Sequence, residues 1–223
     1  MTIARDGVLF VLVTGVISIC FGIAHIIAPS LALSISCAIS GFITLSVFWF
    51  FRDPDRFPDK DLVAKLKFPV VCPAEGRVAD ITELGEKVRI GIFLFVWDIH
   101  VQYVPFKGTI KRISRKKGWH LPAFYSKAAS RKNVSSSIIM EVKGEGGHLF
   151  EVRIRQIVGL VARRIRVWVK EGQNLNIGDR LGMIILGSRT EIFLPKKGLN
   201  IRVKIGKHVR AGETILADYG EKK

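Results

Sequence analysis

The sequence predicts an N-terminal transmembrane helical hairpin followed by a mainly β domain of the barrel or sandwich type that contains lipoyl-like duplicated hairpins. Three observations support this prediction. Residues 7–51 contain no Lys, Arg, Asp or Glu. Residues 68–223 consist mostly of short β-type runs, separated by turn residues at intervals of about ten residues. Two segments of this second part repeat a glycine pattern.

The charge-free stretch is long enough for two membrane-spanning helices, because one span needs about 20 apolar residues. Pro29 lies near its middle, and proline suits a turn or a first helical position but not a helix interior. We therefore expect helices over residues 8–28 and 31–51, which form a two-span anchor of residues 1–51. A signal peptide is disfavoured, because the stretch is too long and a second span follows directly.

A two-span hairpin places both of its ends on one side of the membrane. The basic charge of the remaining chain favours the cytoplasmic face of the plasma membrane for the β domain. A hairpin that enters a single leaflet gives the same sidedness. Residues 52–67 form the expected linker, which begins with the polar, proline-containing segment RDPDRFP.

The β domain is expected to cover residues 68–223. Short helices are expected near residues 122–130 and 158–164. The expected strands cover residues 68–72, 87–95, 99–104, 109–113, 137–142, 150–157, 165–170, 180–186, 190–194, 199–205 and 214–218.

The glycine repeat lies in the C-terminal third of the chain. Gly172 and Gly178 in the first copy match Gly206 and Gly212, which lie 34 residues later. The pattern resembles the turns of lipoyl- and biotinyl-type barrels. A swinging-arm carrier needs a lysine at a hairpin tip in an apolar context such as a Met-Lys-Met turn, and neither copy contains that turn. A structural duplication is therefore the better interpretation.

The charge distribution indicates an anionic partner. The net charge of +16 lies entirely in residues 52–223, and nine Lys or Arg residues but no acidic residue occur from Ile99 to Met140. Such a surface binds phosphate groups of nucleic acid or of anionic lipids. The membrane hairpin favours lipid headgroups, and we expect no nucleic-acid partner. The three cysteines have neither metal-binding nor disulfide spacing, so no metal is expected.

The candidate chemistry begins at Gly187–Ser188, which lies between two strand-like apolar runs. If the Ser188 hydroxyl attacks the Gly187 carbonyl carbon, the peptide bond becomes an ester. Elimination then breaks the chain and leaves Ser188 as an N-terminal pyruvoyl group, an electrophilic ketone. By itself the dipeptide is also a common turn sequence.

Two further residues are candidates for acid–base work. His100 shares one face of a predicted strand with Asp98 and Gln102. Glu75 lies in a turn before a strand. If Glu75 and His100 approach Ser188 in the fold, the three residues form a triad that can deprotonate the serine hydroxyl.

These residues belong to motifs that resemble the phosphatidylserine decarboxylase family in its short, membrane-anchored form. The resemblance extends from the hairpin to near the C-terminus, and the combination of motifs is more specific than any one of them. The motifs are FRDPDR at residues 51–56, CPAEG at 72–76, DIHV at 98–101, VGLVARRI at 158–165 and GMIILGSR at 182–189.

The resemblance implies a self-cleaving, pyruvoyl-dependent carboxy-lyase of phospholipid biosynthesis. It would convert phosphatidylserine to phosphatidylethanolamine and carbon dioxide. Cleavage between Gly187 and Ser188 would give a β chain of residues 1–187 and an α chain of residues 188–223, associated as a heterodimer, alone or in a higher oligomer. The pyruvoyl group derived from Ser188 would form a Schiff base with the serine headgroup and accept the electron pair released with carbon dioxide. His100 is the expected base of self-cleavage, supported by Glu75.

Two motifs depart from the family pattern. The usual Ser-Pro-Ala-Asp-Gly turn has Cys72 and Glu75 here, and the second histidine of the longer bacterial enzymes is replaced by Tyr103. Two alternatives therefore stay open. An archaetidylserine decarboxylase would use the same headgroup chemistry on an ether lipid. A lipid-surface-binding relative that does not process itself would be compatible with the glutamate substitution.

Overall fold

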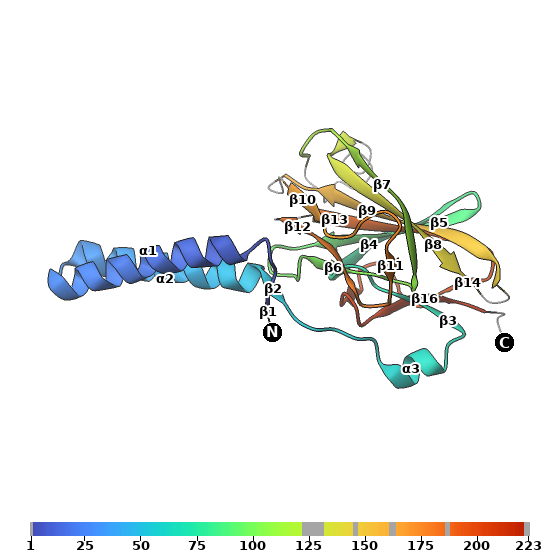
Figure 1. Cartoon of the computed structure of the whole chain (residues 1–223), viewed down its shortest axis with the longest axis horizontal. Helices are drawn as coiled ribbons and strands as arrows, with labels where there is room; N and C mark the ends of the chain where they lie inside the picture. The colour runs from blue at the N-terminus through green and yellow to red at the C-terminus, as the bar shows by residue number, and fades with distance from the viewer. Residues whose placement is uncertain (1, 122–131, 145–146, 161–163, 186–187, 221–223) are drawn as a thin grey trace. The chain divides into compact units, whose positions relative to one another are not determined.

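The computed structural model has two compact units, Met1–Asp55 and Arg56–Lys223 (Figure 1). The first unit is mainly helical and the second mainly β. The residues that the structure describes are 2–121, 132–144, 147–160, 164–185 and 188–220.

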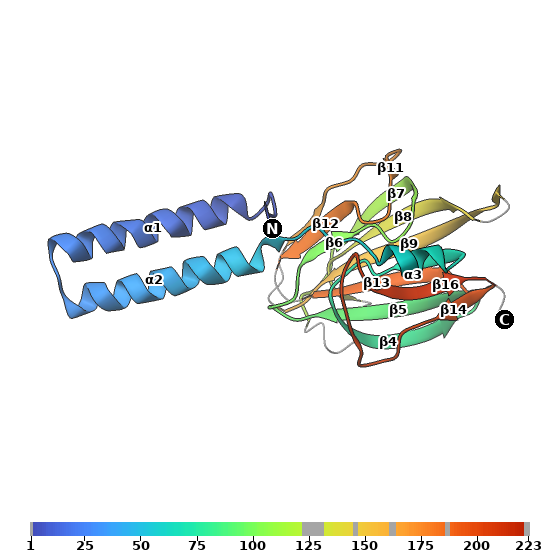
Figure 2. The same cartoon turned by 90° about the horizontal axis from the view of Figure 1, so that it is seen from below.

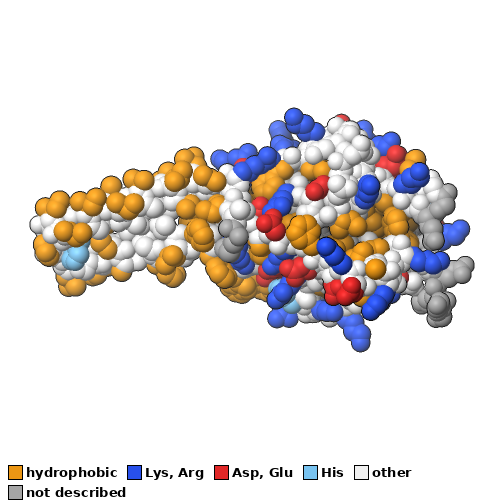
Figure 3. All heavy atoms as spheres, turned by 60° about the horizontal axis from the view of Figure 1, so that its bottom comes forward, with side chains coloured by type: hydrophobic (Ala, Val, Ile, Leu, Met, Phe, Trp, Pro, Cys, Tyr) orange, Lys and Arg blue, Asp and Glu red, His pale blue; other side chains and the backbone are white. Residues whose placement is uncertain are grey.

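Two apolar helices dominate the first unit. Helix α1 runs over Val8–Ile27 and helix α2 over Leu31–Phe50, which confirms both predicted helices. Ser30 begins α2, because its hydroxyl accepts a hydrogen bond from the Leu33 N–H at 3.3 Å. Both helices are long and apolar enough to cross a membrane, and hydrophobic side chains are spread along their surface (Figure 3). These features indicate membrane association.

A small ladder closes the open end of the hairpin. Strand β1 (Thr2–Ile3) pairs antiparallel with strand β2 (Arg52–Asp53). The Arg52 guanidinium lies 4.2 Å from the centre of the Trp49 ring and donates a hydrogen bond to the Trp49 carbonyl oxygen at 2.7 Å. The first and last residues of the unit are therefore held together.

After strand β2, the predicted linker contains the short helix α3 (Lys60–Ala64). Asp59 begins this helix, because its Oδ1 accepts hydrogen bonds from the N–H groups of Asp61 at 2.9 Å and Leu62 at 3.3 Å. The sequence did not predict this turn of helix, because it is too short to show a period.

The second unit is built around a curled, antiparallel sheet (Figures 1 and 2). Within the described residues its strand order is β11-β7-β8-β9-β13-β5-β4-β15. The bounds are β4 Gly76–Leu84, β5 Lys87–Leu94, β7 Gly108–Lys116, β8 Ser135–Lys143, β9 Leu149–Val158, β11 Asn174–Leu175, β13 Ser188–Pro195 and β15 His208–Val209.

Two smaller sheets complete the unit. One has the order β10-β12-β6, with bounds β10 Arg164–Val167, β12 Arg180–Ile185 and β6 Val101–Tyr103. The other has the order β14-β16-β3, with bounds β14 Leu199–Ile201, β16 Ile215–Tyr219 and β3 Phe68–Val71. The three sheets form the mainly antiparallel β domain that the sequence predicted.

The apolar core follows from strand alternation, since every second side chain of a strand points to one face of the sheet. Ile90, Ile92 and Leu94 of β5 lie inside, next to Ile192 and Leu194 of the neighbouring β13. All five are fully buried. Side chains from β3 and β16 belong to the same cluster, so the smaller sheet covers part of the large one.

The repeated glycines adopt one local geometry. Gly172 and Gly178 have φ angles of 81° and 85°, and Gly206 and Gly212 have 85° and 73°. This left-handed region favours glycine. Each copy adds a two-residue strand to the large sheet, β11 in the first and β15 in the second. The duplication is therefore visible in the backbone, while the likeness to lipoyl-type barrels stays a prediction.

Every strand expected from the sequence overlaps an observed one. The long strand β4 was not expected, nor were the two-residue strands β1, β2, β11 and β15. The helix predicted over residues 158–164 is wrong at both ends, because Val158 ends β9 and Arg164 begins β10. Both residues pair across strands, and such tertiary pairing overrides a local helical pattern. The helix predicted over 122–130 lies outside the described residues.

Candidate active site

Ser188 lies at a break in a long two-stranded ribbon. Strand β13 pairs with β9 so that Ser188 is opposite Val158, and β12 pairs with β10 so that Ile185 is opposite Arg164. Residues 159–163 lie between these two pairs on one side, but only residues 186–187 lie between them on the other. The ladder is therefore interrupted next to the bond that the sequence predicts to be cleaved. Gly187 itself lies outside the described residues.

The Ser188 hydroxyl has an unusual environment. The residue is fully buried, and its Oγ has no hydrogen-bond partner among the described residues. Burying a hydroxyl without a partner costs free energy, so most buried hydroxyls in folded proteins are hydrogen-bonded. An unpaired, buried nucleophile at a strand break fits a residue that reacts rather than one that holds the fold.

His100 is fully buried just before strand β6, and its orientation is defined by the backbone. Its Nδ1 lies 2.8 Å from the carbonyl oxygen of Asp98. A carbonyl oxygen accepts hydrogen bonds but cannot donate one, so Nδ1 must carry the hydrogen. The neutral ring therefore has its lone pair on Nε2, which is the atom available as a base.

The carboxylate of Asp98 fixes the loop that precedes His100. Its Oδ2 accepts a hydrogen bond from the Phe95 N–H at 2.8 Å, and its Oδ1 lies 3.1 Å from Nε2 of His208. Glu75, Asp98 and His208 bring possible metal-ligand atoms within 4.8 Å of one another. The Arg56 guanidinium already pairs with Glu75, and it balances the carboxylate charge without a metal.

Glu75 acts on the backbone beside His100. Its Oε1 accepts a hydrogen bond from the Ile99 N–H at 3.3 Å, and its Oε2 lies 2.5 Å from Nη1 of Arg56. The ring Nδ1 of His100 is instead oriented by the Asp98 carbonyl. Arg56 belongs to the FRDPDR motif, but sequence reasoning gave it no role in the site, because the chain separation hides its contact with Glu75.

Cys72 occupies the first position of the turn that carries Glu75. Its Sγ donates a hydrogen bond to the Ala74 carbonyl oxygen at 2.9 Å. Burial raises the pKa of the Cys72 thiol from its ordinary value of 9.0 to about 12, so the thiol is neutral at physiological pH. A neutral thiol keeps the donor role that a serine hydroxyl would have at this position.

A buried polar chain lies beside Ser188. Gln156 donates through Nε2 to the Gln102 Oε1 at 3.2 Å, and Gln102 donates through Nε2 to the Thr190 hydroxyl at 2.7 Å. All three residues are fully buried. Gln102 also lies opposite Gly182 of β12, so this residue contacts both strands that meet at the break. Sequence reasoning noted Gln102 but missed its two partners, because each lies among other polar residues of its strand and no local signal connects them to Gln102.

The opposite face of β13 carries buried charges. Arg189 and Glu191 are fully buried, and the Arg189 Nε lies 3.0 Å from the Glu191 Oε1. Arg189 also pairs with Asp80 of β4. Gly91 of β5 makes this possible, because a Cβ there would lie 2.0 Å from the Arg189 guanidinium. Arg189, the residue that follows Ser188, is thus bonded to β4 of the same sheet.

Comparison with known proteins gives consistent results. A profile described as phosphatidylserine decarboxylase matches residues 43–217. Three relatives carry the name phosphatidylserine decarboxylase proenzyme. The protein from Syntrophus aciditrophicus is 34% identical over 97% of this chain and 97% of its own length. Those from Rhodopirellula baltica (34% identical; 89% and 86%) and Amoebophilus asiaticus (32% identical; 94% and 90%) are similarly complete matches.

Cys72 makes the stability of the fold pH-dependent in alkaline solution. Its folded pKa of about 12 exceeds the ordinary 9.0, so above pH 9 the unfolded chain holds fewer protons and stability falls until about pH 12. We expect the Cys72→Ser variant, which keeps a donor but has no thiol to ionise, to lose less stability over this range. Thermal unfolding of the detergent-solubilised proteins at several pH values between 8 and about 10 measures the difference. Parallel losses in both proteins would contradict this expectation.

Proposed function

Because the chain belongs to the phosphatidylserine decarboxylase family, we propose that it is a carboxy-lyase that converts phosphatidylserine to phosphatidylethanolamine, with a pyruvoyl group made from its own Ser188. The name proenzyme, which the relatives carry, implies that such chains are processed. The observation that carries the proposal for this chain is the buried, unpaired Ser188 hydroxyl at the interruption of the β12–β13 strand.

Self-cleavage requires the Ser188 oxygen to reach the carbonyl carbon of Gly187, the residue before it. A residue inside a regular ladder is held extended by hydrogen bonds on both sides, which opposes this approach. Five residues connect Val158 to Arg164, but only two connect Ile185 to Ser188, so the pairs on the two sides do not share one register. This mismatch supports cleavage between Gly187 and Ser188. When formed, the pyruvoyl group supplies a carbonyl that accepts the electron pair released with carbon dioxide.

His100 is the proposed base for Ser188. Gln102 lies opposite Gly182 and bonds to Thr190, so β12 and β13 reach the same residue from both sides of the break. The carbonyl oxygen of His100 accepts from the Ile184 N–H at 3.4 Å. The antiparallel register of β6 with β12 thus places His100 opposite Ile184, four residues before Ser188 in the chain. His100 comes just before the strand that contacts both β12 and β13, and we propose that its Nε2 accepts the proton of the Ser188 hydroxyl.

Glu75 and Arg56 are proposed to position the base. Their ion pair is nearly buried, and Glu75 also holds the Ile99 N–H, next to His100. Glutamate reaches one methylene further than the aspartate of the usual family turn. The contact with Arg56 supports the idea that the longer side chain still holds its charge in a defined place.

The two products of cleavage are proposed to stay together as a heterodimer of residues 1–187 and 188–223. Strand β13 pairs with β5 on one side and with β9 on the other, and β16 pairs with β3. The buried ion pair of Arg189 with Asp80 adds a further link between the chains. Separation would expose the core of the domain, so association needs no covalent bond.

The membrane part of the proposal rests on the helices. We propose that residues 1–51 span the membrane twice, that residues 52–67 connect this anchor to the catalytic domain of residues 68–223, and that the domain lies on the cytoplasmic face. Two helices apolar enough to cross a bilayer and the excess of basic residues outside them support this arrangement. The substrate is then a lipid of the membrane that anchors the enzyme, and nucleic acid is not a partner.

The mass of the purified protein tests the central proposal. Wild-type protein is expected as two chains that end at Gly187 and begin at Ser188, and it should release labelled carbon dioxide from carboxyl-labelled phosphatidylserine. The Ser188→Ala variant should remain one chain of 24.9 kDa and be inactive. Ser136→Ala is a matched control, because Ser136 is also buried with no described partner for its Oγ. Cleavage or decarboxylation by Ser188→Ala would overturn the assignment.

Replacement of His100 by alanine should slow self-cleavage by at least about a hundredfold, since a positioned base contributes this much. The time course of chain cleavage after synthesis in a cell-free system, followed by gel electrophoresis, measures the rate. His208→Ala is the control, because this histidine also contacts Asp98 but lies partly exposed. Cleavage at the normal rate in His100→Ala would remove His100 from that step.

Two Glu75 variants separate the effect of the carboxylate charge from the effect of side-chain length. Glu75→Gln loses the charge that pairs with Arg56, whereas Glu75→Asp keeps it on a shorter side chain. We expect cleavage to be about tenfold slower in Glu75→Gln than in Glu75→Asp, because the nearly buried Arg56 guanidinium then keeps only its longer pairing with Glu213, at 3.4 Å. The same time course measures both variants, and Arg56→Met should resemble Glu75→Gln. Equal rates for the two Glu75 variants would show that the turn is purely structural.

A further inference from the structure

The two strands that flank β13 both end beside Ser188 and then expose apolar side chains. Ser188 lies opposite Leu94, the last residue of β5, and opposite Val158, the last residue of β9. Beyond β5, Val96 is 49% exposed and Trp97 is 66% exposed; beyond β9, Leu160 is 63% exposed. The buried reactive residue is therefore framed by two apolar loop tips.

The loop tip after β5 is ordered by its own packing. The Trp97 ring stacks on Phe95 with centroids 5.4 Å apart and an interplanar angle of 5°, and Phe95 meets Phe93 edge to face at 4.9 Å. The Asp98 carboxylate closes the loop by accepting from the Phe95 N–H. Trp97 is thus held in an exposed position although its large apolar surface would gain from burial.

A second tryptophan lies at the same end of the large sheet. Trp119 is 69% exposed, and its carbonyl oxygen accepts a hydrogen bond from the Val134 N–H. Val134 in turn accepts a hydrogen bond from Val158, the partner of Ser188. We call Val96, Trp97, Trp119 and Leu160 the apolar rim.

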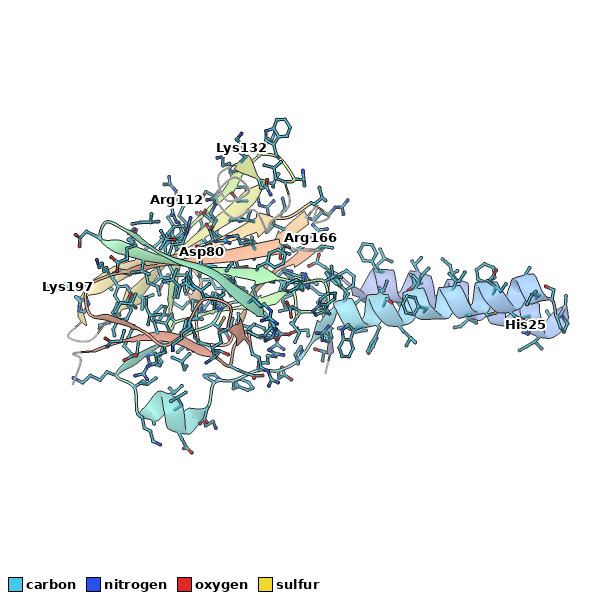
Figure 4. All side chains as sticks on the ribbon, turned by 180° about the vertical axis from the view of Figure 1, so that it is seen from behind. His25, Asp80, Arg112, Lys132, Arg166 and Lys197 are labelled. Atoms are coloured by element: carbon cyan, nitrogen blue, oxygen red, sulfur yellow. The ribbon has the colours of Figure 1, made fainter. Side chains whose placement is uncertain are left out.

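The surroundings of the apolar rim are basic. Exposed cations on the neighbouring segments are Lys116, Lys117, Lys132, Arg164 and Arg166. Residues 114–121, 132–136 and 156–167 contain no Asp or Glu. Figure 4 shows Arg166 and Lys197 at opposite ends of the domain. Arg164 lies opposite Ile185, three residues before Ser188. Tryptophan at the boundary between apolar and aqueous layers, with lysine and arginine around it, is typical of a membrane interface.

We propose that the apolar rim enters the headgroup layer of an anionic phospholipid bilayer and presents the headgroup of a membrane lipid to Ser188. This inference rests on the proposed function, because it requires that the substrate is a membrane lipid. Ser188 is fully buried, so a headgroup must leave the plane of the bilayer to reach it. Insertion of the rim on both sides of Ser188 shortens that path. The basic side chains bind the lipid phosphates around it.

The test compares two substrates in the full-length protein. Wild type, Trp97→Ser and Leu160→Ser are reconstituted in vesicles containing phosphatidylserine, and the same proteins in detergent are given water-soluble, short-chain phosphatidylserine. The loss of rate in the two variants should be about tenfold greater with the bilayer lipid than with the soluble lipid, since removing buried apolar area weakens interfacial binding. Chain cleavage is measured in every sample.

Two exposed leucines provide matched controls, because they lie on the same strand hairpins at the ends away from Ser188. Leu149, at the other end of β9, is 60% exposed, and Leu84, next to the β4–β5 turn, is 47% exposed. Leu149→Ser and Leu84→Ser should show no difference between the two substrates. Equal losses on both substrates in Trp97→Ser and Leu160→Ser, or equal losses in the controls, would overturn the proposal. Absence of cleavage and of decarboxylation in wild type would instead contradict the proposed function.

Fluorescence gives a second readout that does not depend on catalysis. Lipids brominated near the headgroup end of their acyl chains quench tryptophans that lie at the interface. Replacing Trp97 by Phe should remove a clear part of this quenching, whereas replacing the half-buried Trp168 should not. If the rim instead covers a second copy of the chain, quenching stays unchanged and Trp97→Ser alters the oligomeric state. That outcome would also reject the proposal.

Discussion

The break between β12 and β13 is the constraint on which the arrangement of the site depends. Ser188 lies opposite Val158 on one side of it, and Ile185 lies opposite Arg164 on the other. Five residues connect Val158 to Arg164, but only two connect Ile185 to Ser188. One regular register therefore cannot include both pairs, and β6 contacts both halves through Gln102.

Several polar groups around the break are held by specific contacts. Glu75 is held by Arg56 and by a backbone N–H, Asp98 holds its own loop, and the Gln156–Gln102–Thr190 chain crosses the interior. Such contacts restrict the site to one arrangement, because each alternative leaves a donor or acceptor without a partner. The Ser188 hydroxyl shares its lack of a described partner with Ser136 Oγ and Gln156 Oε1, but it alone of these lies next to the bond proposed to be cleaved.

The sequence was sufficient for the features that depend on local pattern. The absence of charge over residues 7–51 and the position of Pro29 predicted both helices, and alternation predicted most strands. It was not sufficient for features that depend on pairing. Val158 and Arg164 lie in strands because of their cross-strand partners, although the segment between them has a helical pattern. Likewise, the burial of Arg189 requires Gly91 on one strand and Asp80 on another, and no local signal connects these positions.

The central position of β13 has a consequence for the lifetime of the proposed enzyme. A prosthetic group that binds reversibly can be replaced after damage. A ketone formed from a residue of β13, which lies between β5 and β9, cannot be exchanged. Each molecule would then form its ketone only once, and an off-pathway reduction or amination of that carbonyl would inactivate the molecule permanently. Protection of that ketone from small nucleophiles in solution would then be as important as its formation, and residue 188 is completely buried.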